Sequence, residues 1–159
     1  MTRPTIDEYL MMVAVAVRSR STCTKPPTAP LGVGCVIASS DGKILATGYS
    51  GSLHGQHHCI DVGHYVVDDR CLRTVHAEQN AIAQAASRGI SVHKSTAYVT
   101  THPCLSCAKL LSASGAEKIL YLDNYILSDD EITRHMVPIP IIPFFGTRFE
   151  VRVVPNQQS

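Results

Sequence analysis

One stretch, RTVHAEQNAIAQAA at residues 73–86, constrains the fold of this chain more than any other. Its pattern predicts a helix over residues 76–88, with Gly89 as the C-terminal cap. Apart from one isoleucine, the face that repeats at helical spacing is alanine, and such small side chains let a helix pack closely against a sheet. Packing does not explain the imidazole and the carboxylate at the entrance of the helix, His76 and Glu78.

A second helix is predicted to begin with reactive side chains, in the stretch THPCLSCAKLL. We expect STAYVTT to form a strand, Pro103 to lie in the first turn of the following helix, and that helix to end near Gly115. Cys104 and Cys107 are three residues apart, so their sulfurs lie on one face, and the positive end of the helix dipole favours their thiolate forms. Two thiolates make half of a tetrahedral zinc site.

His76 can supply a third ligand to the same metal ion. Three protein ligands leave one position for water, which is typical of a catalytic zinc site. A carboxylate beside that water can take its proton and pass it to the substrate. A lone C-x-x-C is often a redox pair or half of a structural site, and a lone H-x-E is common, but their combination at two helix starts is rare. The sequence therefore predicts a catalytic Zn²⁺ held by His76, Cys104 and Cys107, with Glu78 as the proton carrier.

The remaining elements alternate between strands and helices. A capping box formed by Thr5 and Glu8 predicts that the first helix starts near Thr5. Strands are expected at GVGCVIA and KILATGY, joined by a hairpin at Asp41-Gly42, and at KILYL, with a possible last strand at FEVRVV after an irregular, proline-rich tail. This alternation predicts a three-layer α/β fold, and we expect residues 1–159 to form a single domain.

Composition excludes some partners. The chain has 45% hydrophobic and 17% charged residues, an ordinary globular balance, and a formal net charge of +1. This charge provides no general attraction for nucleic acid, so we expect no stable nucleic-acid partner. Without a signal pattern or an apolar run of membrane-spanning length, we expect a cytoplasmic protein with no membrane partner.

Six cysteines in such a protein favour metal binding over disulfides. Cys35 lies inside an apolar run and is expected to be a small buried hydrophobe. Residues 50–74 form a long segment rich in Gly, His, Cys and Asp, and such loops are usually functional or held by a metal.

A second metal site is a hypothesis that the sequence allows. A closed, structural Cys₃His set for Zn²⁺ can be drawn from Cys23, Cys59, His64 and Cys71. The competing histidines are His54, His57 and His58, of which His58, beside Cys59, is the most serious. The simplest alternative is a set of unrelated thiols among surface histidines.

These motifs together resemble the zinc-dependent cytidine deaminase superfamily and, within it, the deoxycytidylate (dCMP) deaminase family with its bacterial late-competence relatives. The resemblance rests on VGCVIA, ATGYSG, CLRTVHAEQNAIAQAA and AYVTTHPCLSCAKLL, and runs from the first helix to about residue 125. It implies a three-layer α/β/α cytidine-deaminase-like fold with a mixed five-stranded sheet. It also implies hydrolysis of dCMP to dUMP and ammonia, which supplies dUMP for dTMP synthesis, by a homo-oligomer that is often a hexamer. Some relatives carry a cysteine where this chain has His64.

Two places bear on substrate and regulation. The family typically has Gly-Tyr-Asn-Gly where this chain reads GYSG, so Ser50 replaces an asparagine that can contact the nucleotide. Many family members are activated by dCTP and inhibited by dTTP, and we expect both effects to be absent or reduced here. Arg20 and Ser21 lie where the family's loop approaches the substrate phosphate, although a solvated arginine at a helix end is an equal alternative. The proline-rich insertion at residues 26–30 also departs from the family.

Two other functions remain open from the sequence. The chain can be a deaminase of another cytosine or adenine nucleoside or nucleotide. It can also be a non-catalytic, zinc-stabilised module of the same fold, although a purely structural zinc site has no need of Glu78.

Overall fold

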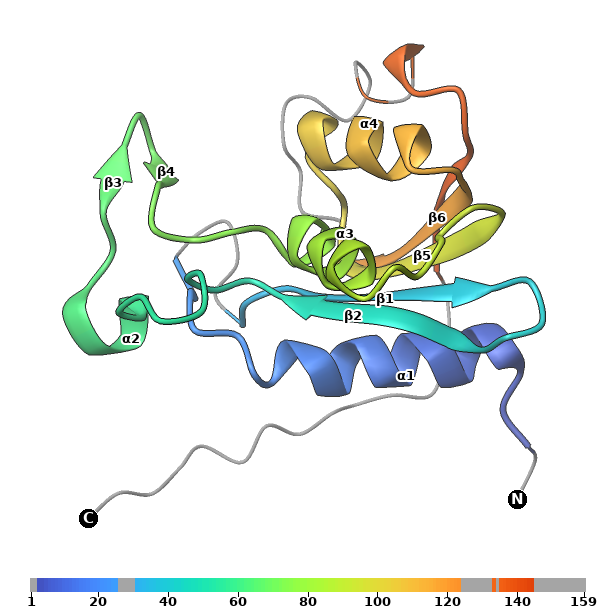
Figure 1. Cartoon of the computed structure of the whole chain (residues 1–159), viewed down its shortest axis with the longest axis horizontal. Helices are drawn as coiled ribbons and strands as arrows, with labels where there is room; N and C mark the ends of the chain where they lie inside the picture. Colours follow the sequence, from blue (N-terminus) through green and yellow to red (C-terminus); the bar gives the residue numbers. More distant parts are fainter. Residues whose placement is uncertain (1–2, 26–30, 124–132, 134, 145–159) are drawn as a thin grey trace.

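The computed structural model describes residues 3–25, 31–123, 133 and 135–144 (Figure 1). Its centre is a mixed five-stranded sheet with the strand order β2-β1-β5-β6-β7. Strand β1 pairs antiparallel with both β2 and β5, while β5, β6 and β7 run parallel. The strands are β1 (Gly34–Ser39), β2 (Ile44–Tyr49), β5 (Ser95–Thr101), β6 (Ala116–Asp123) and β7 (Ile141–Pro143). The predicted mixed sheet of five strands is confirmed.

Helices cover both faces of this sheet, as the three-layer prediction requires (Figure 1). Helix α1 (Ile6–Arg18) lies on one face, and α3 (Ala77–Ser87) and α4 (Leu105–Ala113) lie on the other. Successive side chains of a strand point to opposite faces, so Val36 of β1 packs with the α1 layer and Ile37 with the α3 and α4 layer. None of the helices in the described part of the chain is long and apolar enough to span a membrane.

The predicted capping box starts α1. The Thr5 hydroxyl accepts a hydrogen bond from the Glu8 backbone N–H at 3.2 Å, and the Glu8 carboxylate accepts one from the Thr5 N–H at 2.7 Å. At the far end of α3, Gly89 has φ of +65°, which is the left-handed conformation expected of the predicted C-terminal cap. Both helix boundaries therefore follow from local sequence signals.

Helix α4 starts slightly later than predicted. Pro103 was expected in its first turn, but the helix begins at Leu105, with Cys104 as an extended N-cap. The Cys104 carbonyl accepts the first helical hydrogen bond, from the Ala108 N–H at 2.9 Å. The N-cap of α3 is His76, whose carbonyl accepts from Asn80 N–H at 2.9 Å. Two of the predicted zinc ligands thus occupy equivalent positions at the entrances of two helices.

The alanine face of α3 packs closely on β2, as predicted. A Cβ added at Gly48 would lie 2.2 Å from the Ala77 carbonyl oxygen and 2.4 Å from the Ala81 nitrogen, so only glycine fits there. The Asn80 side-chain amide donates to the Tyr49 carbonyl at 2.8 Å. These contacts fix the N-terminal end of α3 against the carboxyl end of β2.

The fifth strand is not the one expected. FEVRVV, the predicted last strand, lies outside the described residues, whereas the tail that was predicted to be irregular contains β7. Ile141 pairs with Ile119, and the Ile119 N–H donates to the Pro140 carbonyl at 2.9 Å. Strand β7 is the last in the order of the described strands, and an edge strand tolerates proline because one row of its N–H groups makes no ladder bond.

Residues 53–72 form an arm that extends away from the sheet (Figure 1). It contains α2 (Cys59–Val62) and a two-stranded ribbon of β3 (Val66–Val67) and β4 (Arg70–Cys71). Where the arm joins the body, Gly51 and Val75 exchange two backbone hydrogen bonds of 3.2 and 2.8 Å. The segment leaving the arm runs directly into α3.

Candidate functional site

The first candidate metal centre lies where the entrances of α3 and α4 meet. The Nδ1 atom of His76 is 3.6 Å from the Cys104 sulfur and 3.4 Å from the Cys107 sulfur. Zinc bonds of about 2.1 Å to nitrogen and 2.3 Å to sulfur set tetrahedral N···S separations of about 3.6 Å. The three donor atoms lie within 4.8 Å of one another, so this donor set fits one zinc ion with a fourth position left for another ligand.

His76 is held in place by a residue that the sequence analysis missed. The Gln79 side-chain oxygen accepts a hydrogen bond from the His76 backbone N–H at 3.1 Å. Gln79 stands three residues after the N-cap, which is the spacing of the acceptor in a capping box. The H-x-x-Q spacing was therefore a readable signal that the start of α3 is anchored.

Glu78 lies in the first turn of α3 and is 4% exposed. Burial raises the pKa of its carboxyl group, while the charge of the neighbouring His76 partly offsets that rise. The carboxyl group also contacts the Cys107 thiol. Glu78 is therefore a buried carboxyl group beside two of the three metal-ligand candidates, and its raised pKa brings it closer to the range in which it can both accept and release a proton.

The two thiols of this centre are linked. A hydrogen bond from the Cys107 thiol, helped by His76, lowers the pKa of Cys104 to about 4. The same hydrogen bond, with burial, raises the pKa of Cys107 well above its usual value. These opposite shifts of pKa arise from direct interaction of the two thiols, both of which would bind a metal cation as thiolates.

Exposure differs across this centre. His76 is exposed and Cys104 is partly buried, whereas Cys107 and Glu78 are buried. The centre is thus open on the His76 side and closed on the side of the helix core.

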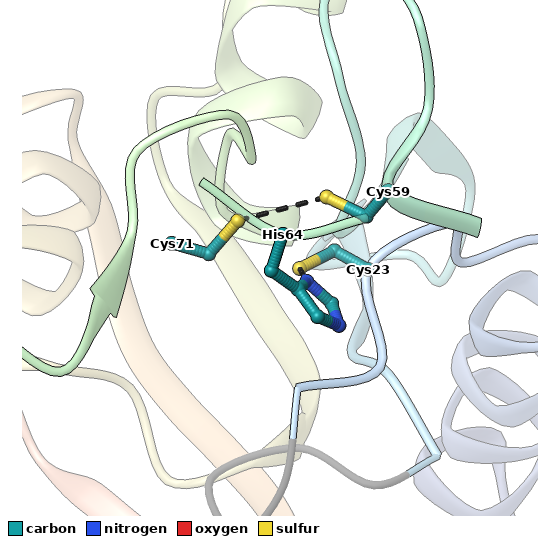
Figure 2. Close-up of side chains that lie close together, drawn as sticks. All are labelled: Cys23, Cys59, His64 and Cys71. Carbon is teal, nitrogen blue, oxygen red and sulfur yellow. Dashed lines mark hydrogen bonds between the residues drawn. The ribbon is translucent and has the colours of Figure 1, made fainter. Parts of the chain in front are cut away.

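The second candidate metal centre ties the arm to the end of α1 (Figure 2). Its donors are those of the predicted Cys₃His set, and all four donor atoms lie within 4.8 Å of one another. The Cys23 sulfur is 3.5 Å from His64 Nδ1, and the Cys59 and Cys71 sulfurs are 3.6 Å apart. Tetrahedral zinc sets N···S and S···S separations of about 3.6–3.8 Å, so this donor set also fits zinc.

The competing histidines lie elsewhere. His58 Nδ1 is 3.0 Å from the Thr22 hydroxyl, and His58 does not belong to the cluster of donors. His54 and His57 are exposed and lie outside the cluster. Of the four histidines considered for this site, the structure brings only His64 to the thiols. Cys35 is fully buried in β1, as predicted.

The three residues predicted to contact the substrate lie near the end of α1 and the end of β2, and their contact with a nucleotide stays a prediction. Ser50 is 6% exposed, and its hydroxyl accepts from the Val33 N–H at 3.0 Å and donates to the Cys23 carbonyl at 3.3 Å. The Ser21 hydroxyl donates to the Ser50 carbonyl at 2.8 Å and contacts the Ser50 hydroxyl. These two serines therefore join loops of the protein to one another. Arg20 is exposed at the end of α1, and its contact with a phosphate stays a prediction.

Comparisons with known proteins agree with this geometry. Residues 4–123 match the family described as the cytidine and deoxycytidylate deaminase zinc-binding region. The chain is 37% identical over 125 residues to ComE operon protein 2 of Bacillus subtilis (strain 168), an alignment that covers 79% of this chain and 63% of that protein. The chain thus spans less than two thirds of that relative's length.

Two further proteins extend the likeness. Deoxycytidylate deaminase of Mycobacterium phage D29 is 33% identical over 133 residues, covering 76% of this chain and 97% of the phage protein. The crystal structure of dCMP deaminase from the cyanophage S-TIM5 in complex with dCMP and dUMP matches with a TM-score of 0.73 and 26% identity, covering 91% of this chain and 100% of that one.

Proposed function

The chain belongs to the cytidine and deoxycytidylate deaminase family, and from this premise we propose that it hydrolyses dCMP to dUMP and ammonia. The observation that carries the proposal is the meeting of three metal donors within 4.8 Å beside a buried carboxyl group, that of Glu78. In pyrimidine deoxynucleotide metabolism this reaction supplies dUMP for dTMP synthesis. A cytoplasmic location, expected from the sequence, stays a prediction.

Each residue of the core site has a separate role in this reaction. His76 Nδ1 and the sulfurs of Cys104 and Cys107 would hold a zinc ion, which when bound would act as a Lewis acid and make water a better nucleophile. Glu78 takes a proton from the attacking water and delivers it to the ring nitrogen beside the reacting carbon. Glu78 then takes the remaining proton from the hydroxyl that the attack has placed on the carbon and passes it to the amino group, which leaves as ammonia while the carbonyl forms. Gln79 keeps His76 oriented through the backbone hydrogen bond described above.

The test is ammonia release by the purified, zinc-loaded protein from dCMP, CMP, deoxycytidine, dCTP and a tRNA anticodon stem. We expect dCMP to be the preferred substrate. Preference for another of these molecules would favour a deaminase of different specificity, and no release from any of them would favour a zinc-stabilised module without activity.

We further propose that the arm cluster holds a second, structural zinc ion. Four donors close a tetrahedral site without room for water, and three of them come from the arm while Cys23 comes from the body. Many arm residues are exposed and therefore contribute little packing of their own. A metal ion that joins Cys23 to the arm supplies the order that packing does not.

We also propose that the chain assembles with copies of itself, with a hexamer as the favoured state. The support is apolar surface on the arm, where four aliphatic side chains are between 42% and 66% exposed: Ile60, Val62, Val66 and Val67. Monomeric proteins rarely leave such patches uncovered. Light scattering after size exclusion should give a multiple of 17.2 kDa that decreases in Ile60→Asp. A wild-type mass of one chain would contradict the assembly.

A further inference from the structure

The outer edge of β2 is the side of this strand that faces away from β1. Strand β2 is the first in the order of the described strands, so this side has no neighbouring strand among them. The Ser50 N–H donates to the Val33 carbonyl at 2.9 Å, on the side of β1. Successive residues of a strand turn their backbone groups to opposite sides, so Thr47, Tyr49 and, just beyond the strand, Gly51 turn theirs to the outer edge.

Two amide side chains of α3 bind this edge, and both are half-buried. The Thr47 N–H donates to the Gln84 side-chain oxygen at 3.0 Å, and the Asn80 side-chain amide donates to the Tyr49 carbonyl at 2.8 Å. Asn80 and Gln84 are four residues apart, so they lie on the same side of the helix, one turn apart. Because a carbonyl only accepts and an N–H only donates, the backbone partners fix which atom of each amide makes the contact.

A third contact with the outer edge lies just before α3. Gly51 and Val75 exchange two backbone hydrogen bonds, so the chain is fixed to this edge one residue before His76. The next contact with the edge is the one that Asn80 makes. His76 and Glu78 therefore lie between two fixed points on one strand edge, which are separated by little more than one helical turn of sequence.

Asn80 also connects the outer edge to the metal-ligand candidate. Its backbone N–H donates to the His76 carbonyl at 2.9 Å, while its side chain binds Tyr49. On the face of the same strand, a Cβ at Gly48 would lie 2.2 Å from the Ala77 carbonyl oxygen. Contact with the face fixes the distance of α3 from the strand, and contact with the edge fixes the rotation of the helix and its position along the strand.

From these contacts we propose that Asn80 is a positioning residue, which uses the outer edge of β2 to hold His76 and Glu78 in place. This role rests on the proposed function and adds a residue that contacts neither substrate nor metal. Misplacing reacting groups by about 1 Å can cost about 100-fold in rate, so a bond that fixes the start of α3 bears directly on turnover. Gln84 continues the same edge contact one turn further from the centre.

The two amides allow a matched pair of substitutions. Asn80→Asp and Gln84→Glu each replace an amide by a carboxylate of nearly the same shape and add one negative charge. Asn80→Asp removes the donor and places an oxygen against the Tyr49 carbonyl, whereas Gln84→Glu keeps the acceptor for the Thr47 N–H. The same chemical change should therefore break one edge contact and preserve the other.

The experiment measures kcat and KM for dCMP well below Tm, together with Tm and zinc affinity by competition with a chelator. Asn80→Asp should lower kcat about 10- to 100-fold with a smaller change in KM, and should weaken binding of the zinc ion that His76 helps to hold by about 10- to 100-fold. Gln84→Glu should match wild type in both respects. Asn80→Ala removes the donor without adding charge, so it should show smaller losses of the same kind and replaces Asn80→Asp if that variant does not fold.

Equal losses in Asn80→Asp and Gln84→Glu would overturn the proposal, since the added charge would then explain both. A lower Tm in Asn80→Asp with unchanged kcat and zinc affinity would also overturn it, because the bond would then only stabilise the fold. The zinc competition does not depend on the reaction. Failure of the wild type to release ammonia from dCMP would therefore remove the proposed function, whereas equal zinc affinity in Asn80→Asp and wild type would remove the positioning role.

Discussion

The two Cys/His clusters of this protein share donor chemistry but differ in what carries the donors. In the core cluster, His76 and Cys104 are the N-caps of two helices that pack on the sheet. In the arm cluster, Cys23 follows α1, and its three partners lie in a short helix, a loop and a two-stranded ribbon. The core cluster has three donors and a buried carboxyl group, whereas the arm cluster has four donors and no carboxylate among them.

This difference separates chemistry from structural support. The sheet, the capping bonds and the contact at Gly48 position the core donors, so a metal there adds reactivity. The arm lies away from the sheet and exposes much of its surface, so a metal there adds order (Figure 1). Clusters with similar donor spacing therefore have two different roles. A substitution in one cluster should remove its role and leave the other cluster intact.

The largest effect is expected from Glu78→Ala. Removing the proton carrier should reduce dCMP turnover by about 10²–10⁴-fold or more, because one group serves several proton transfers. Both zinc ions should remain bound, since Glu78 is a ligand in neither cluster. Glu117→Gln, which alters an exposed carboxylate on β6, is the control and should leave turnover unchanged. A Glu78→Ala enzyme within a few-fold of wild type would refute the proton-carrier assignment.

A smaller effect, on stability and not on chemistry, is expected from Cys71→Ser. Opening the arm cluster should lower Tm by roughly 5–15 °C, the range that corresponds to a few kcal/mol for a chain of this size. Backbone amides of residues 53–72 should also exchange with solvent faster. His57→Ala, an exposed histidine of the same segment outside the cluster, is the control. Equal Tm and equal exchange in Cys71→Ser and wild type would show that the cluster has no structural role.

The smallest effect concerns regulation. Because Ser50 replaces the family's asparagine and its hydroxyl bonds to Val33 and Cys23, we expect dCTP activation and dTTP inhibition to be weak or absent. The rate should depend hyperbolically on dCMP concentration with or without dCTP and magnesium. A sigmoidal curve that becomes hyperbolic on adding micromolar dCTP would contradict this expectation.

Local signals predicted the core of this protein well. The capping box of Thr5 and the alanine face of α3 each specified their element, because both depend on neighbouring residues. Prolines obscured the fifth strand, since they argue against a strand unless its place at a sheet edge is known. That place depends on pairing with β6, which is distant in sequence.

The candidate sites also differ in how far local sequence signals predict them. The compact H-x-E and C-x-x-C motifs predicted which residues meet in the core cluster. Spacing did not favour His64 over His58; that choice came from the resemblance, in which some relatives carry a cysteine at this place. The structure agrees with it, since His64 lies with the three thiols and His58 contacts Thr22.

The central claim is that the core cluster is catalytic and the arm cluster is structural. Zinc stoichiometry and dCMP turnover, measured on the same samples, test this claim most directly. Wild type should contain two zinc ions per chain. Cys71→Ser should contain one and keep its turnover at a temperature where it is folded, while Cys104→Ser or Cys107→Ser should also contain one and lose turnover. One zinc ion in wild type with no change in Cys71→Ser, or full zinc content in Cys104→Ser, would contradict the account.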